Sequence, residues 1–224
     1  MACPDHFLYG VSNLEEAVAT IEAETGLKAT PGGRHENIGT RNAFIGLADD
    51  MYIELLAPDP EQSRDASVAS ILYALPENGL IGWCARSDNL DALATAYVES
   101  NTSDIIGPTN WRRHLPDGGA IDWQLLHVSP SPIGALQPFF INWGETPHPT
   151  ENLHPQGACT TFSLTSPHTT QLKSHLEAAQ LDIEQSAGPE NSIVLKVDTG
   201  RSIVTLKSVS PLPFPLMPNG GNAS

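Results

Sequence analysis

The chain opens with PDHFLYGV at residues 4–11, and the unit that begins there closes with YIELL at residues 52–56. Both stretches are short, apolar and rich in residues that favour β-strands. The first holds an imidazole, His6, and the second a carboxylate, Glu54, each flanked by apolar residues. Burying such polar groups is costly unless something pairs with them, so we expect His6 and Glu54 to share a partner in a cleft.

A helix and two more strands are predicted between these two stretches. Asn13 is a good N-cap for a helix over residues 14–23, and Gly26 is placed to end it in a left-handed turn. The strands that follow are predicted at residues 27–30, 42–47 and 51–56. The unit therefore has the order β-α-β-β-β.

The same order recurs twice more along the chain. The second copy is predicted as a strand at 80–85, a helix at 89–100, and strands near 104–106, 121–128 and 138–143. The third, degenerate copy is predicted as a strand at 160–165, a helix at 168–180, and strands near 183, 193–197 and 203–207. Such repetition indicates modular duplication, because one unit cannot bury its sheet face alone.

These repeats define the predicted domains. Residues 1–156 form one domain of two modules, 1–60 and 79–145, joined by a helical connector over residues 64–75. The third module occupies residues 157–210 and extends or caps the sheet, and residues 211–224 form a Pro-rich tail.

The charge of the chain limits its partners. Its 11 Lys and Arg against 26 Asp and Glu give a formal net charge of −15, which repels phosphate backbones and anionic lipid surfaces. We therefore expect a small-molecule substrate or ligand, no nucleic acid and no membrane, with a homodimer left open. The N-terminus lacks the pattern of a leader, and no run approaches the roughly 20 apolar residues of a membrane span, so the expected location is cytoplasmic.

The three cysteines, Cys3, Cys84 and Cys159, are far apart and form no CxxC pair. Their odd number and spacing argue against a disulfide framework and against a structural zinc knuckle. We expect reduced thiols.

Several segments, taken in their order, resemble the vicinal oxygen chelate (VOC) superfamily and more narrowly its glyoxalase-like branch. Those of the first module are DHF at 5–7, NLEEA at 13–17, TGL at 25–27 and YIEL at 52–55. Supporting segments are GGRH at 32–35, GTRN at 39–42, Arg113 with PDG at 116–118, Trp123, and PFFINW at 138–143.

The resemblance implies an α+β fold in which repeated βαβββ modules form a curled mixed sheet around a cleft. It also implies metal ligands on the first and last strands of each module, and His6 and Glu54 match the pair of the first module. The second module departs from the pattern, because Gly82 or Trp83 and Asn142 stand where ligands are expected. A four-ligand site cannot be carried over.

His35 is the predicted third metal ligand, since it lies in a Gly-rich turn whose backbone bends freely. With His6 and Glu54 it would complete a set of two histidines and one carboxylate, which leaves positions on Fe, Mn, Ni or Zn open for a substrate. His148 is the reserve. The alternatives are structural: a locally hydrogen-bonded His6, a Glu54 on a solvated sheet face, and a His35 that serves only its turn.

Five residues are predicted to bind the substrate: Asn42, Arg113, Trp123, Asn142 and Trp143. The arginine would bind a carboxylate or enolate oxygen in a two-pronged geometry, the amides would orient an oxygen, and the indoles would wall the pocket. The alternatives are a surface ion pair, bonds to loop backbone and core packing. Arg34 and Arg112 are weaker candidates of the same kind, and no catalytic acid or base can be named.

Together these patterns predict a metal-dependent VOC-type enzyme of the lyase, isomerase or dioxygenase type. The metal would bind adjacent oxygens of a small substrate and stabilise a developing enolate or oxyanion. The alternative is a metal-free module of the same fold that binds or sequesters a small molecule. The missing ligands of the second module favour that alternative.

Overall fold

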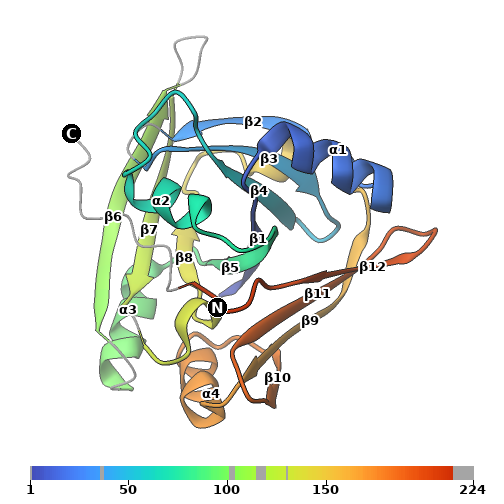
Figure 1. Cartoon of the computed structure of the whole chain (residues 1–224). Helices are drawn as coiled ribbons and strands as arrows, with labels where there is room; N and C mark the ends of the chain where they lie inside the picture. Colours follow the sequence, from blue (N-terminus) through green and yellow to red (C-terminus); the bar gives the residue numbers. More distant parts are fainter. Residues whose placement is uncertain (1, 36–37, 101–103, 115–119, 130, 214–224) are drawn as a thin grey trace.

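A computed structural model gives the structure of the chain and describes residues 2–35, 38–100, 104–114, 120–129 and 131–213. The strands of these residues form two sheets, one of eight strands and one of four (Figure 1). The larger sheet has the order β2-β3-β4-β1-β5-β8-β7-β6. Its strands are β1 (Cys3–Gly10), β2 (Thr30–His35), β3 (Thr40–Gly46), β4 (Tyr52–Pro58), β5 (Gly79–Arg86), β6 (Ile105–His114), β7 (Ala120–Val128) and β8 (Phe139–Asn142).

The larger sheet consists of two halves with the same connectivity. In each half the first and last strands are parallel neighbours, β1 with β4 and β5 with β8. The antiparallel pairing of β1 with β5 joins the halves at the centre of the sheet. The predicted α+β class, with paired βαβββ modules in a curled mixed sheet, is confirmed.

The helix ends follow the capping residues of the sequence. Helix α1 (Leu14–Thr25) begins at Asn13, whose side chain accepts a hydrogen bond from the backbone of Glu16, and it ends at Gly26 with φ of 76°. Helix α3 (Leu90–Glu99) begins in the same way at Asn89. The connector helix α2 (Ser67–Tyr73) is shorter than the predicted residues 64–75.

Two strands differ from the prediction. Strand β2 covers Thr30–His35 and not residues 27–30, because Leu27 is buried in the core directly after the helix cap and the strand begins beyond it. Strand β6 covers Ile105–His114, far beyond the predicted 104–106. Its polar residues show no apolar alternation, so only its pairing with β7 defines it as a strand.

The third unit forms the smaller sheet. Its elements are β9 (Ala158–Ser166), α4 (Thr169–Ala178), β10 (Glu184–Ala187), β11 (Ser192–Asp198) and β12 (Ile203–Lys207). The element order is again β-α-β-β-β, but here β10 pairs directly with β9 and the sheet order is β10-β9-β11-β12. Phe162 joins the two sheets, since its ring centroid lies 4.9 Å from that of Phe7 and 4.8 Å from that of Trp83.

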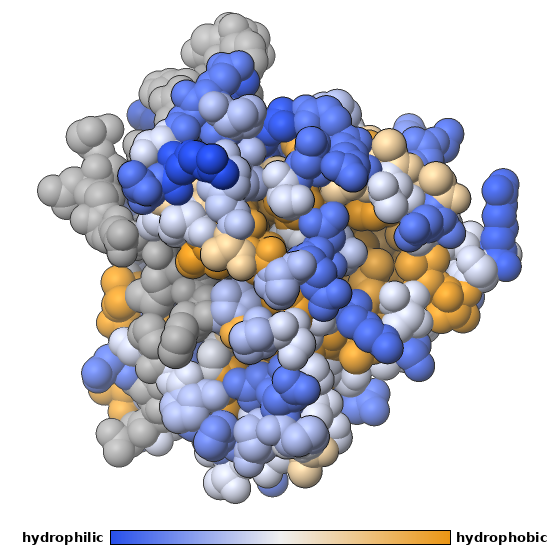
Figure 2. Space-filling model, in the orientation of Figure 1, coloured by the Kyte–Doolittle hydropathy of each residue, from blue (hydrophilic) through white to orange (hydrophobic). Residues whose placement is uncertain are grey.

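The surface of the molecule shows both the polar and the apolar residues of the sequence. On the face seen in Figure 2, apolar side chains gather in a band across the middle, between polar upper and lower parts.

Three further predictions concern the cysteines, membrane spans and the tail. Cys3, Cys84 and Cys159 are free thiols, as predicted. Among the described helices none is long and apolar enough to span a membrane. The predicted Pro-rich tail lies outside the described residues beyond 213, as does the PDG segment at 116–118.

Candidate functional site

The pairing of β1 with β4 brings His6 and Glu54 together. His6 lies opposite Tyr52 and Leu8 opposite Glu54, so these four side chains point to the same face of the sheet. His6 Nε2 lies 3.7 Å from Glu54 Oε2. Both residues are buried, with 4% and 8% of their surface exposed. The two side chains therefore lie close together on one face of the sheet, whereas neither lines the small cavity or the larger groove.

A β-bulge at Asp5 adds a second carboxylate to this face. Pro4 pairs with Ala85 and His6 with Cys84, so Asp5 is an extra residue that the partner strand does not match. The bulge places the Asp5 side chain beside its neighbour, and His6 Nδ1 lies 2.6 Å from Asp5 Oδ1. Since an ionised carboxylate only accepts, His6 carries its proton on Nδ1 and turns the lone pair of Nε2 toward Glu54.

Asp5 is fully buried and collects donors from distant parts of the chain. Its Oδ2 lies 3.0 Å from His148 Nε2 and accepts a hydrogen bond of 3.2 Å from Trp143 Nε1. Burial alone would raise the pKa of Asp5, but the hydrogen bonds and charges of His148 and His6 bring it well below its ordinary value. Asp5 was not among the predicted site residues, and its only signal in the sequence is its place beside His6.

Asn42 holds Glu54 in place. Its Oδ1 accepts a hydrogen bond of 2.7 Å from the backbone N–H of Gly33, which fixes the orientation of the amide. Its Nδ2 then donates to Glu54 Oε1 at 2.6 Å and lies 3.5 Å from His35 Nε2. One oxygen of Glu54 is thus occupied, and the other, Oε2, faces His6.

His35 lies one amide group away from Glu54. Its Nδ1 is 2.8 Å from Thr40 Oγ1. Burial lowers the pKa of His35 below its ordinary value. The charge of Glu54 raises this pKa and that of Arg113 lowers it, and the net shift is downward. His35 is therefore a neutral imidazole at pH 7. Both nitrogens of His148, the reserve ligand, are engaged, Nε2 with Asp5 and Nδ1 with Thr150 at 2.7 Å.

Two further buried groups surround His6. The ring of Tyr52 stacks on it with centroids 4.7 Å apart. Burial, followed by the charges of Asp5 and Glu54, raises the pKa of both the Tyr52 hydroxyl and the Cys84 thiol well above their ordinary values, so both groups keep their protons.

Arg113 reaches this cluster from the opposite edge of the larger sheet. It lies on the edge strand β6, yet a Cβ added to Gly33 of the other edge strand, β2, would come within 2.8 Å of Arg113 Nη1. The curled sheet thus brings its two edges together near His35, as the approach of β6 toward β2 in Figure 1 shows. Arg113 is the cation that this closure places at the site.

The other predicted residues lie in different surroundings. Trp143 binds Asp5, and Trp123 lies beside it with ring centroids 6.2 Å apart. Asn142 bonds to loop backbone, donating to Asp88 O at 3.3 Å and accepting from Gly144 N at 2.9 Å. Arg34 and Arg112 are exposed and form ion pairs, Arg34 with Glu61 and Arg112 with Asp122.

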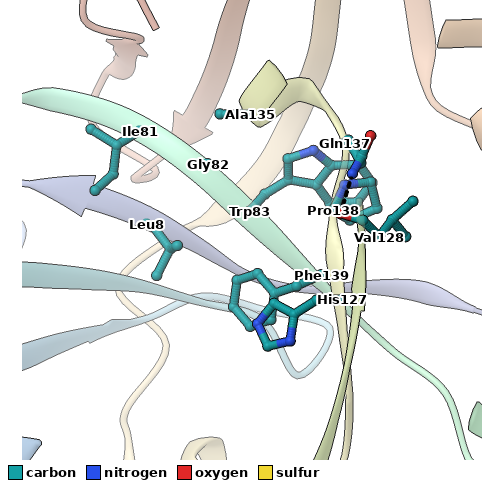
Figure 3. A pocket seen from close by; sticks show the side chains of 10 residues that line it. All are labelled: Leu8, Ile81, Gly82, Trp83, His127, Val128, Ala135, Gln137, Pro138 and Phe139. Carbon is teal, nitrogen blue, oxygen red and sulfur yellow. Dashed lines mark hydrogen bonds between the residues drawn. The ribbon is translucent and has the colours of Figure 1, made fainter. Parts of the chain in front are cut away.

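A small cavity of about 20 Å³, lined by Leu8, His127 and Phe139 among others, lies near the site (Figure 3). The ring of Phe139 contacts both the site and the cavity, because its centroid lies 5.7 Å from the His6 ring centroid and 5.7 Å from the His127 ring centroid. A larger groove of about 370 Å³ opens on the other face of β1, around Phe7 and Phe162, and none of the predicted site residues lines it.

The donor set fits a divalent metal at His6 and Glu54. Within the described residues, neither His6 Nε2 nor Glu54 Oε2 has a hydrogen-bond partner, and their separation of 3.7 Å suits two ligands that are each about 2.1 Å from one ion. Asp5, His6 and Cys84 also bring their ligand atoms within 4.8 Å of one another. That group is less suited, because Asp5 is already engaged and the Cys84 thiol keeps its proton.

Comparison with known proteins gives a family and a fold. A family model described as a glyoxalase-like domain matches residues 5–180. A hypothetical protein from Staphylococcus aureus is similar over 96% of this chain and 89% of its own, with a TM-score of 0.66 and 18% identity. This similarity shows a shared fold that includes the third unit.

Two smaller proteins are similar over part of the chain. The methylmalonyl-CoA epimerase from Mycobacterium tuberculosis covers 62% of this chain and 84% of its own, with a TM-score of 0.43 and 19% identity. A hypothetical protein from Bacillus halodurans C-125 covers 62% and 91%, with a TM-score of 0.45 and 17% identity. None of the curated proteins compared with the chain matches it.

Proposed function

The chain belongs to the glyoxalase-like domain family of the VOC superfamily, and we propose that it is a divalent-metal-dependent enzyme acting on a small oxygen-rich substrate. One observation carries this proposal. His6 Nε2 and Glu54 Oε2 face each other at 3.7 Å on buried side chains, and neither has another partner among the described residues. Two such groups left facing each other favour a shared cation.

His6 and Glu54 would hold the metal. His35 is the third donor of the proposed set, although its nitrogens do not lie within 4.8 Å of both ligand atoms, so it would have to move toward them. Asp5 keeps the proton of His6 on Nδ1, and Asn42 holds one oxygen of Glu54, so both proposed ligands are fixed by partners behind them. When bound, the ion would supply Lewis-acid stabilisation of a developing oxyanion.

The substrate is proposed to lie between the proposed ligands and Arg113. The guanidinium of Arg113 would bind an anionic oxygen, and Trp123 and Trp143 would limit the access of water. This arrangement suits a lyase, isomerase or dioxygenase type of reaction on a molecule with adjacent oxygens.

Metal content tests the proposal directly. Purified protein is stripped with a chelator, refilled with Fe(II), Mn, Ni or Zn, dialysed, and measured by mass spectrometry of the elements. We expect about one tightly bound ion per chain. His6→Ala and Glu54→Gln should lose it, because each removes one of two facing donors. His168→Ala, at an exposed histidine, is the matched control and should keep the metal.

Equal metal content in wild type, His6→Ala and Glu54→Gln would exclude this site. If the metal depends on these residues, a screen of dicarbonyls, catechols and acyl thioesters with the refilled protein follows. His35→Ala then decides the third donor, since its loss should weaken the metal binding and not abolish it.

A second candidate, a metal-free module that binds a small molecule, is favoured by one observation. Asn42 lies between the proposed ligands Glu54 and His35 and hydrogen-bonds to the first of them. In that case the cluster is a hydrogen-bonded polar network, and no ion is required. Chelated protein would then bind its ligand as tightly as refilled protein, which quenching of tryptophan fluorescence measures.

A further inference from the structure

His127 is a buried histidine whose ring nitrogens have no hydrogen bond within the described part of the chain. It lies on β7, only 7% of its surface is exposed, and its ring stacks on Phe139 at an interplanar angle of 14°. Its ring nitrogens are not fully enclosed by protein atoms, so a ligand can reach them and supply the bond that the described residues do not.

The cavity of about 20 Å³ that His127 lines offers room for one small group, about the size of a water molecule. Figure 3 shows the rings of His127 and Phe139 lying together, with Leu8 across from them. The remaining lining is mostly apolar, and Gly82 contributes no side chain to it. Among the described residues, His127 is therefore the titratable group that lines this cavity.

This cavity lies next to the candidate site, and the Phe139 ring that lines it also contacts His6. Leu8 is the next residue after His6 that points to the same face of β1, and Phe139 contacts both imidazoles. His6 and His127 therefore lie on two sides of one aromatic ring, so a molecule bound at His6 and Glu54 would reach His127 by passing Phe139.

We propose that this cavity is a binding subsite for the uncharged end of a small substrate, whose hydroxyl or carbonyl oxygen is hydrogen-bonded to His127. The subsite rests on the proposed function and deepens it by assigning a substrate class. That class is a small molecule with adjacent oxygens at one end and a compact, uncharged, oxygen-bearing group at the other.

The protonation state of His127 agrees with an uncharged group. Burial lowers the pKa of His127 to about 4, so the ring is neutral at pH 7. A neutral imidazole offers one donor and one acceptor, which matches a hydroxyl or a carbonyl. It brings no positive charge to balance a carboxylate in an apolar cavity.

Two substitutions test the subsite independently. A Cβ on Gly82 would lie 3.7 Å from Leu8 Cδ1 and 3.9 Å from Ala135 O, which are ordinary contacts, so Gly82→Ala fills the cavity without a clash. His127→Phe keeps the stacked ring and removes its nitrogens, whereas His127→Gln keeps a donor and an acceptor. Near-ultraviolet circular dichroism checks that each variant is folded.

The probes are dihydroxyacetone, which has adjacent oxygens at one end and an uncharged hydroxyl at the other, and glycolate, which has adjacent oxygens, carries a carboxylate and lacks the further hydroxyl. Their affinities are measured by ligand-observed NMR on full-length protein, both chelated and refilled with metal. We expect Gly82→Ala and His127→Phe to weaken dihydroxyacetone binding roughly tenfold or more, and His127→Gln to stay within about threefold of wild type. Glycolate binding should not change in any variant.

Absence of dihydroxyacetone binding to wild type, or equal binding to wild type, Gly82→Ala and His127→Phe, would overturn the subsite. A glycolate affinity that depends on Gly82 would overturn its preference for an uncharged group. The two proposals fail separately. If the protein holds no metal while dihydroxyacetone binding depends on Gly82 and His127, the proposed function fails and the subsite stands.

Discussion

At the scale of single residues, the candidate site depends on Asp5. This carboxylate touches neither Glu54 nor Arg113, yet it fixes the proton of His6 and joins β1 to Trp143 and to His148 in the loop after β8. Its burial is tolerated because all of its nearest partners donate to it. We therefore assign it a positioning role.

Asp5→Asn should lower the free energy of unfolding by about 2 kcal/mol at pH 7, because a buried ionic acceptor is lost. The pKa of Asp5 is lowered in the folded protein, so there the carboxylate stays ionised while an unfolded aspartate takes up a proton below a pH of about 4. The stability that Asp5 adds is thus complete above that pH and is lost as the pH falls below it.

Urea unfolding of wild type and Asp5→Asn at pH 7 and at pH 3 measures this effect. The difference between the two proteins should be large at pH 7 and smaller at pH 3. Asp182→Asn, at an exposed aspartate, is the control and should differ little from wild type at either pH. A difference that stays the same at both values would contradict the linkage.

At the scale of elements, the hairpin of β2 and β3 determines how Glu54 is presented. Gly32 and Gly33 lie at a bulge, where the register shifts between Pro31 and Arg34. The N–H of Gly33 binds Asn42, and Asn42 binds Glu54, so the backbone of an edge strand positions a carboxylate two strands away.

Neighbouring glycine substitutions should therefore have unequal effects. A Cβ on Gly32 would lie 2.1 Å from Asn42 Oδ1 and 2.8 Å from a ring carbon of Phe44, so Gly32→Ala must displace the buried amide. We expect it to cost about 2 kcal/mol of stability and to weaken the proposed metal binding.

Gly33→Ala is the matched control, because its Cβ would meet only the mobile end of Arg113, at 2.8 Å from Nη1. We expect a change in stability within about 0.5 kcal/mol. Thermal unfolding and metal content of both variants measure the comparison. A larger effect of Gly33→Ala than of Gly32→Ala would show that Asn42 is not held as described.

At the scale of the whole molecule, the two sheets share one core. A continuous cluster of buried residues includes Phe7 and Trp83 of the larger sheet and Leu164 and Leu195 of the smaller sheet, and Phe162 packs against it. The larger sheet therefore relies on the third unit to cover the face opposite the candidate site.

Phe162→Ala should reduce stability by about 2 to 3 kcal/mol, since it removes a ring packed between the sheets. Unfolding should remain a single transition, because the shared core couples both sheets. Tryptophan fluorescence and far-ultraviolet circular dichroism in urea would then coincide. Ile203→Ala, at a residue that is 54% exposed, is the control. Two separate transitions in wild type would instead make the third unit an independent domain.

The sequence by itself determined the repeated βαβββ order and the caps at Asn13 and Gly26. These follow from local capping and from period-two alternation within strands, which act over a few residues. It did not determine the extent of β6, whose polar residues become a strand only by pairing with β7.

Only the tertiary structure decided which groups complete the site. Asp5 enters it through a bulge that depends on the pairing with β5, and His148 and Trp143 reach it from far along the chain. Arg113 and Gly33 approach because the sheet curls until its edges meet. Such contacts depend on the closure of the whole sheet, and no spacing within a single strand or helix encodes them.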